Sequence, residues 1–150
     1  MGYEVRVADA TDAERIAQLL HDFNTEYGDP TPGPEKLAER VRELSAAGEI
    51  TVLLAAGGLA VLRFRPSLWK EALDAYLEEL YVVPGRRGQG IGRALMNRAI
   101  EVARERGAGD MHLGTSEDDV AARKLYESLG FDNHEQGPDG PVMYFYEREV

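Results

Sequence analysis

The sequence contains no cysteine, which excludes disulfide bonds, thiolate metal ligands and a cysteine nucleophile. Basic residues are also scarce: 17 lysines and arginines stand against 27 aspartates and glutamates, and the formal net charge is −10. Because proteins that bind nucleic acids generally present a basic surface, we expect no nucleic-acid partner. An acidic protein instead attracts cationic partners such as polyamines or amino sugars, although the same charge also serves solubility.

Long apolar runs are missing as well. No stretch approaches the roughly 20 apolar residues that a membrane-spanning helix requires, and residues 1–9 lack the basic start and apolar run of a signal peptide. We therefore expect a cytoplasmic protein that does not enter a membrane. His21, His112 and His134 are not spaced as metal ligands, so we expect no metal. With 150 residues, 43% of them apolar, the chain is expected to form a single domain over residues 1–150.

The apolar periodicity predicts an α/β protein. Two helices are expected to begin at Thr11, where Glu14 would complete a capping box, and at Pro34, which suits a first helical turn. Two more are expected over residues 91–106 and 120–129. Strands are expected at 4–7, 50–56, 59–64, 75–83, 111–115 and 142–150. This order predicts helices packed on a mixed sheet, in which the strand–helix–strand unit over 75–115 is parallel and right-handed.

A glycine- and arginine-rich loop between a predicted strand and a predicted helix is the strongest local signal. It covers residues 83–92, with the sequence Val-Pro-Gly-Arg-Arg-Gly-Gln-Gly-Ile-Gly. A helix N-terminus exposes unpaired N–H groups and a partial positive charge, and glycines let an anion approach the backbone closely. Together with Arg86 and Arg87, these amides predict a site for a pyrophosphate.

Two nucleotide-binding motifs fit this loop poorly. A P-loop requires lysine and then serine or threonine after its second glycine, but Ile91 and Gly92 follow Gly90. A Rossmann fingerprint requires a glycine where Arg93 stands, and it belongs at the first strand of a fold. A plain turn with solvated arginines is the remaining alternative. Three alternating glycines at a strand-to-helix junction favour the phosphate site.

The loop and a later segment together resemble the GNAT N-acetyltransferase superfamily. Its cofactor motif, Arg/Gln-x-x-Gly-x-Gly/Ala, is matched by Arg87, Gly90 and Gly92, and its second signature by residues 122–131, Ala-Arg-Lys-Leu-Tyr-Glu-Ser-Leu-Gly-Phe. The order of elements matches along nearly the whole chain. The resemblance implies a mostly antiparallel central sheet with a parallel fourth and fifth strand, flanking helices, and acetyl transfer from acetyl-coenzyme A (acetyl-CoA) to an amine.

The resemblance also implies roles for individual residues. Backbone groups of Leu80, Tyr81 and Val82 would pair with the pantetheine arm, and one of their amides would stabilise the oxyanion. Tyr126 would protonate the departing thiolate, with a purely structural core aromatic as the alternative. The motif residue Arg87 would also belong to the cofactor site, and the pyrophosphate would bind the backbone amides of Gly88, Gln89, Gly90, Ile91, Gly92 and Arg93.

Asp119 departs from the family pattern, which often has asparagine seven residues before the tyrosine, in contact with the cofactor arm. An ionised aspartate cannot donate a hydrogen bond. We therefore expect Asp119 to cap the helix that begins at Val120, and a contact with the cofactor stays open.

Two adjacent glutamates precede the loop. An amine attacks a thioester only when it is neutral, so a base, or a water held by one, must take its proton. Strand alternation would place Glu78 and Glu79 on opposite faces, so that one could face the substrate. We expect Glu78 to be the base or to hold the water, and Glu79 to contact the substrate. Solvated strand carboxylates are the alternative.

Residues 76–82, Tyr-Leu-Glu-Glu-Leu-Tyr-Val, resemble the diamine (spermidine/spermine) acetyltransferase branch of the family. This resemblance implies a pocket lined by Trp69, and the resemblance to the whole family implies a homodimer. The acidic character of the chain and the Glu78–Glu79 pair favour a small cationic amine as substrate. Trp69 could equally be a surface anchor, and Tyr27, with Glu26 and Asp29, could form the other wall. Direct transfer in a ternary complex is expected, since no acyl-enzyme nucleophile is evident. The alternatives are acetylation of a protein N-terminus or lysine, and a non-catalytic acetyl-CoA sensor.

Overall fold

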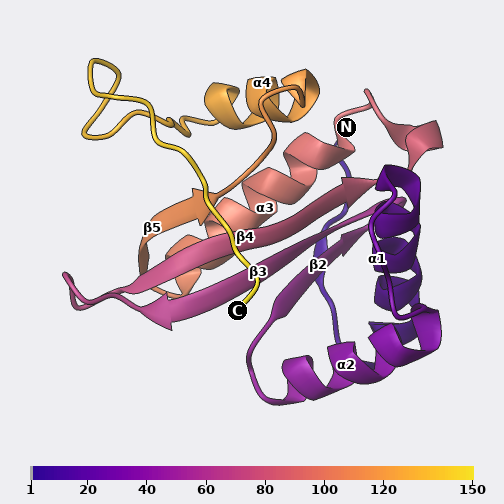
Figure 1. Ribbon diagram of the computed structural model, residues 1–150. Coiled ribbons are helices and arrows are strands. Elements are labelled where there is room, and N and C mark those ends of the chain that lie inside the picture. The colour runs from indigo at the N-terminus through magenta and orange to yellow at the C-terminus, as the bar shows by residue number, and fades with distance from the viewer. Residues whose placement is uncertain (1) are drawn as a thin grey trace. The chain divides into compact units, whose positions relative to one another are not determined.

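The computed structural model describes residues 2–150, and the chain divides into two compact units, residues 1–113 and 114–150. Within the described part of the first unit lie a five-stranded sheet and three α-helices (Figure 1). The second unit carries one further α-helix among those residues. No helix in the described chain is long and apolar enough to cross a membrane.

The first two helices follow one another closely. A 3₁₀ turn, η1 (Ala10–Asp12), leads into α1 (Ala13–Tyr27), which ends at Gly28 in the left-handed region with φ 74°. The predicted capping box lies elsewhere than expected, because Asp9 and Asp12 form it, not Thr11 and Glu14. Carboxylates three residues apart provide the same reciprocal hydrogen bonds. The second helix, α2 (Pro34–Ala46), begins at its proline as predicted.

The five strands lie side by side in the order of the sequence. They are β1 (Arg6–Val7), β2 (Thr51–Ala55), β3 (Gly58–Pro66), β4 (Leu73–Val82) and β5 (Ala108–Leu113). The first four pair antiparallel, and β4 pairs parallel with β5, which confirms the predicted mixed sheet. The 3₁₀ turn η2 (Pro84–Arg86) and α3 (Ile91–Glu105) connect the parallel pair.

Helices cover both faces of this sheet (Figure 1). On one face, Leu59 and Tyr81 pack with Ile16 of α1 and Val41 of α2 in a buried cluster. On the other face lies α3: a Cβ built on Gly58 would come within 3.1 Å of Leu95. Neighbouring strand residues point to opposite faces, so the sheet is buried from both sides. Burial of this apolar surface is the main stabilising contribution to the unit.

A β-bulge in β4 changes the expected alternation. Leu77 pairs with Leu62 and Glu79 pairs with Val61, so Glu78 is an additional residue in β4. Val61 and Leu62 are consecutive in β3, so their side chains point to opposite faces of the sheet. Their partners Glu79 and Leu77 therefore also point to opposite faces, although two residues two positions apart in a regular strand would share a face. The bulge turns the side chain of Glu79 toward the face that α1 and α2 cover.

The second unit contains α4 (Val120–Ser128) and the chain's C-terminal segment. Asp119 caps α4, because its side chain accepts a hydrogen bond from Ala122 N at 3.2 Å, as predicted. The strand predicted over residues 142–150 is wrong. In the described chain, Val142 forms one isolated bridge to His134, and Met143 N donates to the carbonyl of residue 133 at 2.7 Å. Apolar and aromatic residues alone do not make a strand without a ladder of partners.

Candidate functional site

Strand β4 continues beyond the point where its parallel neighbour stops. β5 pairs with β4 up to Leu77, opposite Leu113, whereas β3 pairs with β4 up to Val82. Val83 N donates to Gly57 O at 2.8 Å on the β3 side. Because the backbone groups of successive strand residues point to alternate edges, Val82 and Leu80 direct their N–H and C=O groups to the opposite edge. We call the backbone of Leu80–Val82 on this β5 side the open edge of β4.

The glycine-rich loop follows this edge directly. Gly88 and Gly90 have φ values of 74° and 90°, a conformation that residues with a side chain rarely adopt, and α3 then begins at Ile91. A Cβ built on Gly88 would meet nothing within 4 Å in the described chain, and one on Gly90 would lie 3.9 Å from Tyr3 Cε2. Among the described residues, no side chain caps the N-terminus of α3. These features suit an anion bound by backbone amides.

The side chain of Arg87 folds back from the loop. Arg87 Nε donates to Val82 O at 2.9 Å, and Arg87 Nη2 donates to Glu26 Oε1 at 2.7 Å. Tyr81 OH donates to the same oxygen of Glu26 at 2.8 Å. The guanidinium therefore lies on protein groups, and its expected part in cofactor binding stays a prediction.

The two glutamates of β4 lie in different electrostatic surroundings. Glu78 accepts a hydrogen bond from Arg63 Nε at 2.5 Å. Arg63 is two residues from Val61, the partner of Glu79, so both glutamates have their partners on the α1 and α2 side of the sheet. The prediction of opposite faces is wrong here because of the bulge. Burial, followed by the charges of Glu78 and Asp29, raises the pKa of Glu79 to about 7.

The predicted acceptor residues lie at separate places. Tyr27 is the last residue of α1, 57% exposed, and its ring meets Phe23 edge-on at 5.4 Å between centroids. Phe23 stacks on Tyr81 at 4.7 Å, so Tyr27 joins the group of side chains around Glu26. Trp69 is 89% exposed in the loop that precedes β4, whereas the glycine-rich loop follows the other end of that strand. Its place in a pocket stays a prediction.

Tyr126 belongs to α4 in the second unit. Its ring meets Phe131 edge-on at 6.0 Å between centroids, and the side chain is buried. Burial, followed by the charge of Asp119, raises the pKa of Tyr126 to about 12. The phenol therefore keeps its proton near neutral pH, as a general acid must. Its catalytic role and any contact of Asp119 with a cofactor stay predictions.

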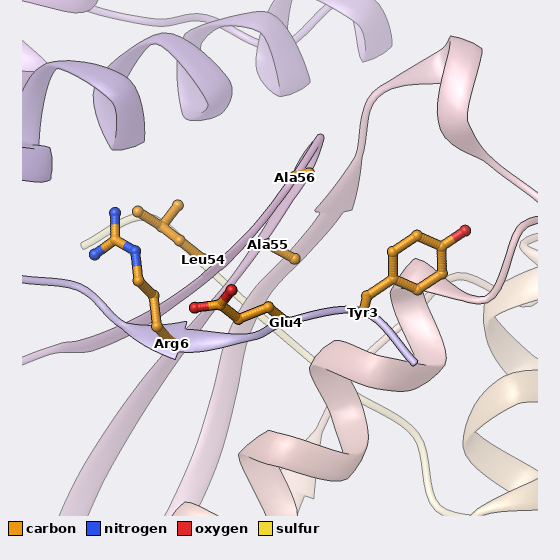
Figure 2. Close-up of a pocket in the computed structure, with 6 residues that line it drawn as sticks. All are labelled: Tyr3, Glu4, Arg6, Leu54, Ala55 and Ala56. Atoms are coloured by element: carbon orange, nitrogen blue, oxygen red, sulfur yellow. The ribbon is translucent and has the colours of Figure 1, made fainter. Parts of the chain in front are cut away.

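A small hollow lies beside the short edge strand. Figure 2 shows the side chains around it, and its volume is about 250 Å³. It is lined by Tyr3, Glu4, Arg6, Leu54, Ala55 and Ala56. None of these residues was predicted from the sequence as part of a site. Tyr3 is nevertheless close to Gly90, and no motif in the sequence indicated this proximity.

The residues described include no cluster of three or more histidine, cysteine, aspartate or glutamate side chains that could hold a metal ion. The sequence had given no indication of the pairing of Arg63 with Glu78, which depends on the bulge. It named Asp29 as part of the acceptor wall, but not its electrostatic influence on Glu79.

Comparison with known proteins gives a consistent picture. The model of the acetyltransferase (GNAT) family matches residues 14–131. A mycothiol acetyltransferase from Beutenbergia cavernae is 33% identical over 134 residues, which cover 87% of this chain and 45% of that protein. A thialysine N-epsilon-acetyltransferase from Bos taurus is 37% identical over 73 residues, 49% of this chain and 42% of that protein.

One solved structure matches along nearly the whole length of both chains. It is a candidate acetyltransferase from Arthrobacter sp. FB24, 45% identical, with a TM-score of 0.90, covering 98% of this chain and 96% of that one. By contrast, the chain spans less than half the length of the mycothiol and thialysine acetyltransferases that it matches.

Proposed function

The chain belongs to the acetyltransferase (GNAT) family, and from this premise we propose that it transfers an acetyl group from acetyl-CoA to a primary amine of a small cationic molecule. The observation that carries the proposal is the open edge of β4, which runs directly into the loop of Gly88 and Gly90. An extended acyl-pantetheine arm needs a strand edge, and its pyrophosphate needs backbone amides at a helix N-terminus. Both occur here in sequence order.

The residues of the first unit fit this co-substrate. Leu80 offers its N–H and C=O groups and Val82 its N–H group to an added strand, while the Val82 carbonyl accepts from Arg87. One of these amides would also stabilise the oxyanion that forms when the amine attacks the thioester. Gly88 leaves open space where a Cβ would otherwise lie, so a phosphate could approach its backbone. The amides of the following residues up to Arg93 complete the proposed pyrophosphate site.

Glu79 is the proposed base. Glu78 is engaged by Arg63, whereas Glu79 has a pKa raised to about 7 and therefore can both take and release a proton near neutral pH. This assignment exchanges the roles expected from the sequence for the two glutamates. Glu79 would accept the proton of the ammonium, directly or through a water, and the neutral amine would then attack the thioester carbonyl.

Tyr126 is the proposed acid. As the amine forms the new C–N bond, the C–S bond breaks, and the sulfur leaves as a thiolate that needs a proton. A phenol with a pKa of about 12 is fully protonated near neutral pH and can supply it. The resemblance in residues 122–131 supports this role.

The acidic surroundings of the proposed base support a cationic acceptor. Glu78 and Asp29 both act on Glu79, and the net charge of the chain is −10. By its name, the thialysine N-epsilon-acetyltransferase acts on an amine of an amino acid. A homodimer and a cytoplasmic location are further proposals, which rest on the family resemblance and on the sequence.

Mass spectrometry of the products would separate this function from peptide acetylation. Diamines, polyamines, amino acids, aminoglycosides and lysine-containing peptides would each be incubated with acetyl-CoA and the purified protein. We expect a gain of one acetyl group on a small cationic amine. Acetylation confined to peptides would replace the proposed acceptor class, and acetyl-CoA binding without any product would indicate a sensor.

A further inference from the structure

The Arg87 side chain connects parts of the first unit that are far apart in the sequence. Arg87 has an extended backbone, with φ −73° and ψ 154°, between the η2 turn and Gly88. Its Nε donates to Val82 O at 2.9 Å, so the side chain bridges the turn back to the last residue of β4. By the alternation of backbone groups described above, this carbonyl lies on the open edge. Arg87 therefore fixes the end of that edge relative to the start of the glycine segment.

The other end of the guanidinium reaches α1. Arg87 Nη2 and Tyr81 OH both donate to Glu26 Oε1, at 2.7 and 2.8 Å. The guanidinium carbon also lies 5.6 Å from the centroid of the Tyr81 ring, a cation–π distance. Glu26 is the penultimate residue of α1, next to Tyr27. We call Glu26, Tyr81, Arg87 and the Val82 carbonyl the Arg87 network.

The charges of this network hold it together. The hydrogen bond from Arg87 lowers the pKa of Glu26, and Glu26 in turn raises the pKa of Arg87, so both stay ionised near neutral pH. Their side chains are 27% and 40% exposed, so water screens the pair only in part. A planar guanidinium can donate in two directions at once, which a lysine ammonium does not do with the same fixed geometry.

We propose that Glu26 is a positioning residue for acetyl-CoA, which it orders through Arg87 without touching the co-substrate itself. This inference rests on the proposed function, because it concerns the same loop. Gly88 and Gly90 gain conformational freedom in the absence of a side chain, and binding must restrict that freedom. By holding Arg87, Glu26 reduces the entropy cost of ordering the loop before acetyl-CoA binds. It also links the loop to the end of α1, where the acceptor wall is proposed.

A competing role for Glu26 makes the opposite prediction. If Glu26 merely occupied Arg87 until a phosphate displaced it, removal of its charge would release the guanidinium and tighten acetyl-CoA binding. The second contact of Arg87, with Val82 O, favours the positioning role. That contact holds the guanidinium against the strand end independently of its contact with Glu26.

Calorimetric titration with acetyl-CoA tests the inference without knowledge of the acceptor. The variants are Glu26→Gln, Arg87→Lys and their combination. Glu14→Gln is the matched control, since Glu14 is also a glutamate of α1 paired with an arginine, Arg42. Thermal unfolding of each variant shows whether it is folded. If Glu26→Gln does not fold, Tyr81→Phe replaces it, because it removes one hydrogen bond to Glu26 and keeps the ring that stacks on Phe23.

We expect the Kd for acetyl-CoA to rise about 10-fold in Glu26→Gln and about 3-fold in Tyr81→Phe. It should stay unchanged in Glu14→Gln. The double variant should bind no more weakly than Arg87→Lys alone, because Glu26 acts through Arg87. An unchanged or lower Kd in folded Glu26→Gln would overturn the inference. A wild-type protein that does not bind acetyl-CoA would instead contradict the proposed function itself.

Discussion

Arg63 Nε donates a hydrogen bond to Glu78 at 2.5 Å, and this ion pair distinguishes Glu78 from the neighbouring Glu79. This contact engages the Glu78 carboxylate with the positive charge of the guanidinium. Glu79 instead pairs with Val61 on the face covered by α1 and α2, where burial raises its pKa to about 7. The bulge at Glu78 thus gives two adjacent, chemically identical side chains different properties.

Substitution of each glutamate separates their roles. Glu79→Gln removes the proposed base, and we expect kcat to fall about 100-fold or more. Glu78→Gln, the matched control in the same strand, should cost no more than about 10-fold, mainly by disturbing Arg63. Steady-state kinetics with a turned-over amine measures both. A larger loss of kcat in Glu78→Gln would restore the assignment expected from the sequence.

The raised pKa of Glu79 predicts a dependence of stability on pH. Its pKa is 4.5 in an ordinary environment and about 7 in the fold, so the folded chain binds the proton more tightly than the unfolded chain. The resulting stability is fully present below about pH 4.5 and is lost as the pH rises through about 7. Glu79→Gln should therefore be more stable than the wild type at about pH 8, by no more than about 3 kcal/mol, and should lose that advantage near pH 4.5.

Urea unfolding of both proteins at these two pH values measures the effect. The relevant quantity is the difference between the free energies of unfolding of the wild type and Glu79→Gln, compared between the two pH values. The other titratable groups are the same in the two proteins, so their contributions cancel in this difference. A difference that is the same at both pH values would show that the side chain of Glu79 is not sufficiently buried to shift its pKa.

The glycine loop can be tested with two alanines. Gly88 has φ 74° and Gly107 has φ 78°, and a Cβ on either would meet nothing within 4 Å in the described chain. Each substitution to alanine should destabilise the fold by about 1–2 kcal/mol through left-handed strain alone. Only Gly88→Ala should weaken acetyl-CoA binding, by about 10-fold or more, since its Cβ would project into the proposed phosphate site.

Calorimetry gives the affinities and thermal unfolding gives the stabilities in that comparison. Equal loss of affinity in Gly88→Ala and Gly107→Ala would show that the effect comes from destabilisation. The loss of affinity in Gly88→Ala would then carry no information about a phosphate site at the loop.

Amide hydrogen exchange tests the open edge of β4. The N–H groups of Leu80 and Val82 point to the edge where β5 no longer pairs, whereas the N–H of Tyr81 faces β3. Saturation with acetyl-CoA should slow exchange at Leu80 and Val82 about 10-fold or more, and leave Tyr81 nearly unchanged. Protection that appears equally at all three residues would indicate general stiffening of the strand, and not an added strand partner.

Much of the fold could be predicted from the sequence, because local patterns determine it. Pro34 marked the start of α2, and the glycines of the loop marked the junction before α3. The parallel β4–β5 pair followed from the strand–helix–strand connection. The capping role of Asp119 was also predicted correctly, because a cap depends only on residues within one helical turn.

The failures concern relations between distant residues. The bulge at Glu78 depends on how β4 pairs with β3, and nothing within residues 76–82 indicates it. The ion pair of Arg63 with Glu78 and the link between Glu26 and Arg87 join residues 15 and 61 positions apart. A strand was predicted over residues 142–150, after the turn at residues 137–141, but pairing partners decide whether a strand forms.

Thiol release from acetyl-CoA is the measurement that tests the central claim most directly. The purified wild type, Glu79→Gln and Tyr126→Phe would each be assayed with a panel of diamines, polyamines, amino acids and aminoglycosides. We predict turnover by the wild type on a cationic amine and a loss of about 100-fold in both variants. A wild type that binds acetyl-CoA but releases no thiol with any amine, or variants that are as active as the wild type, would contradict the account.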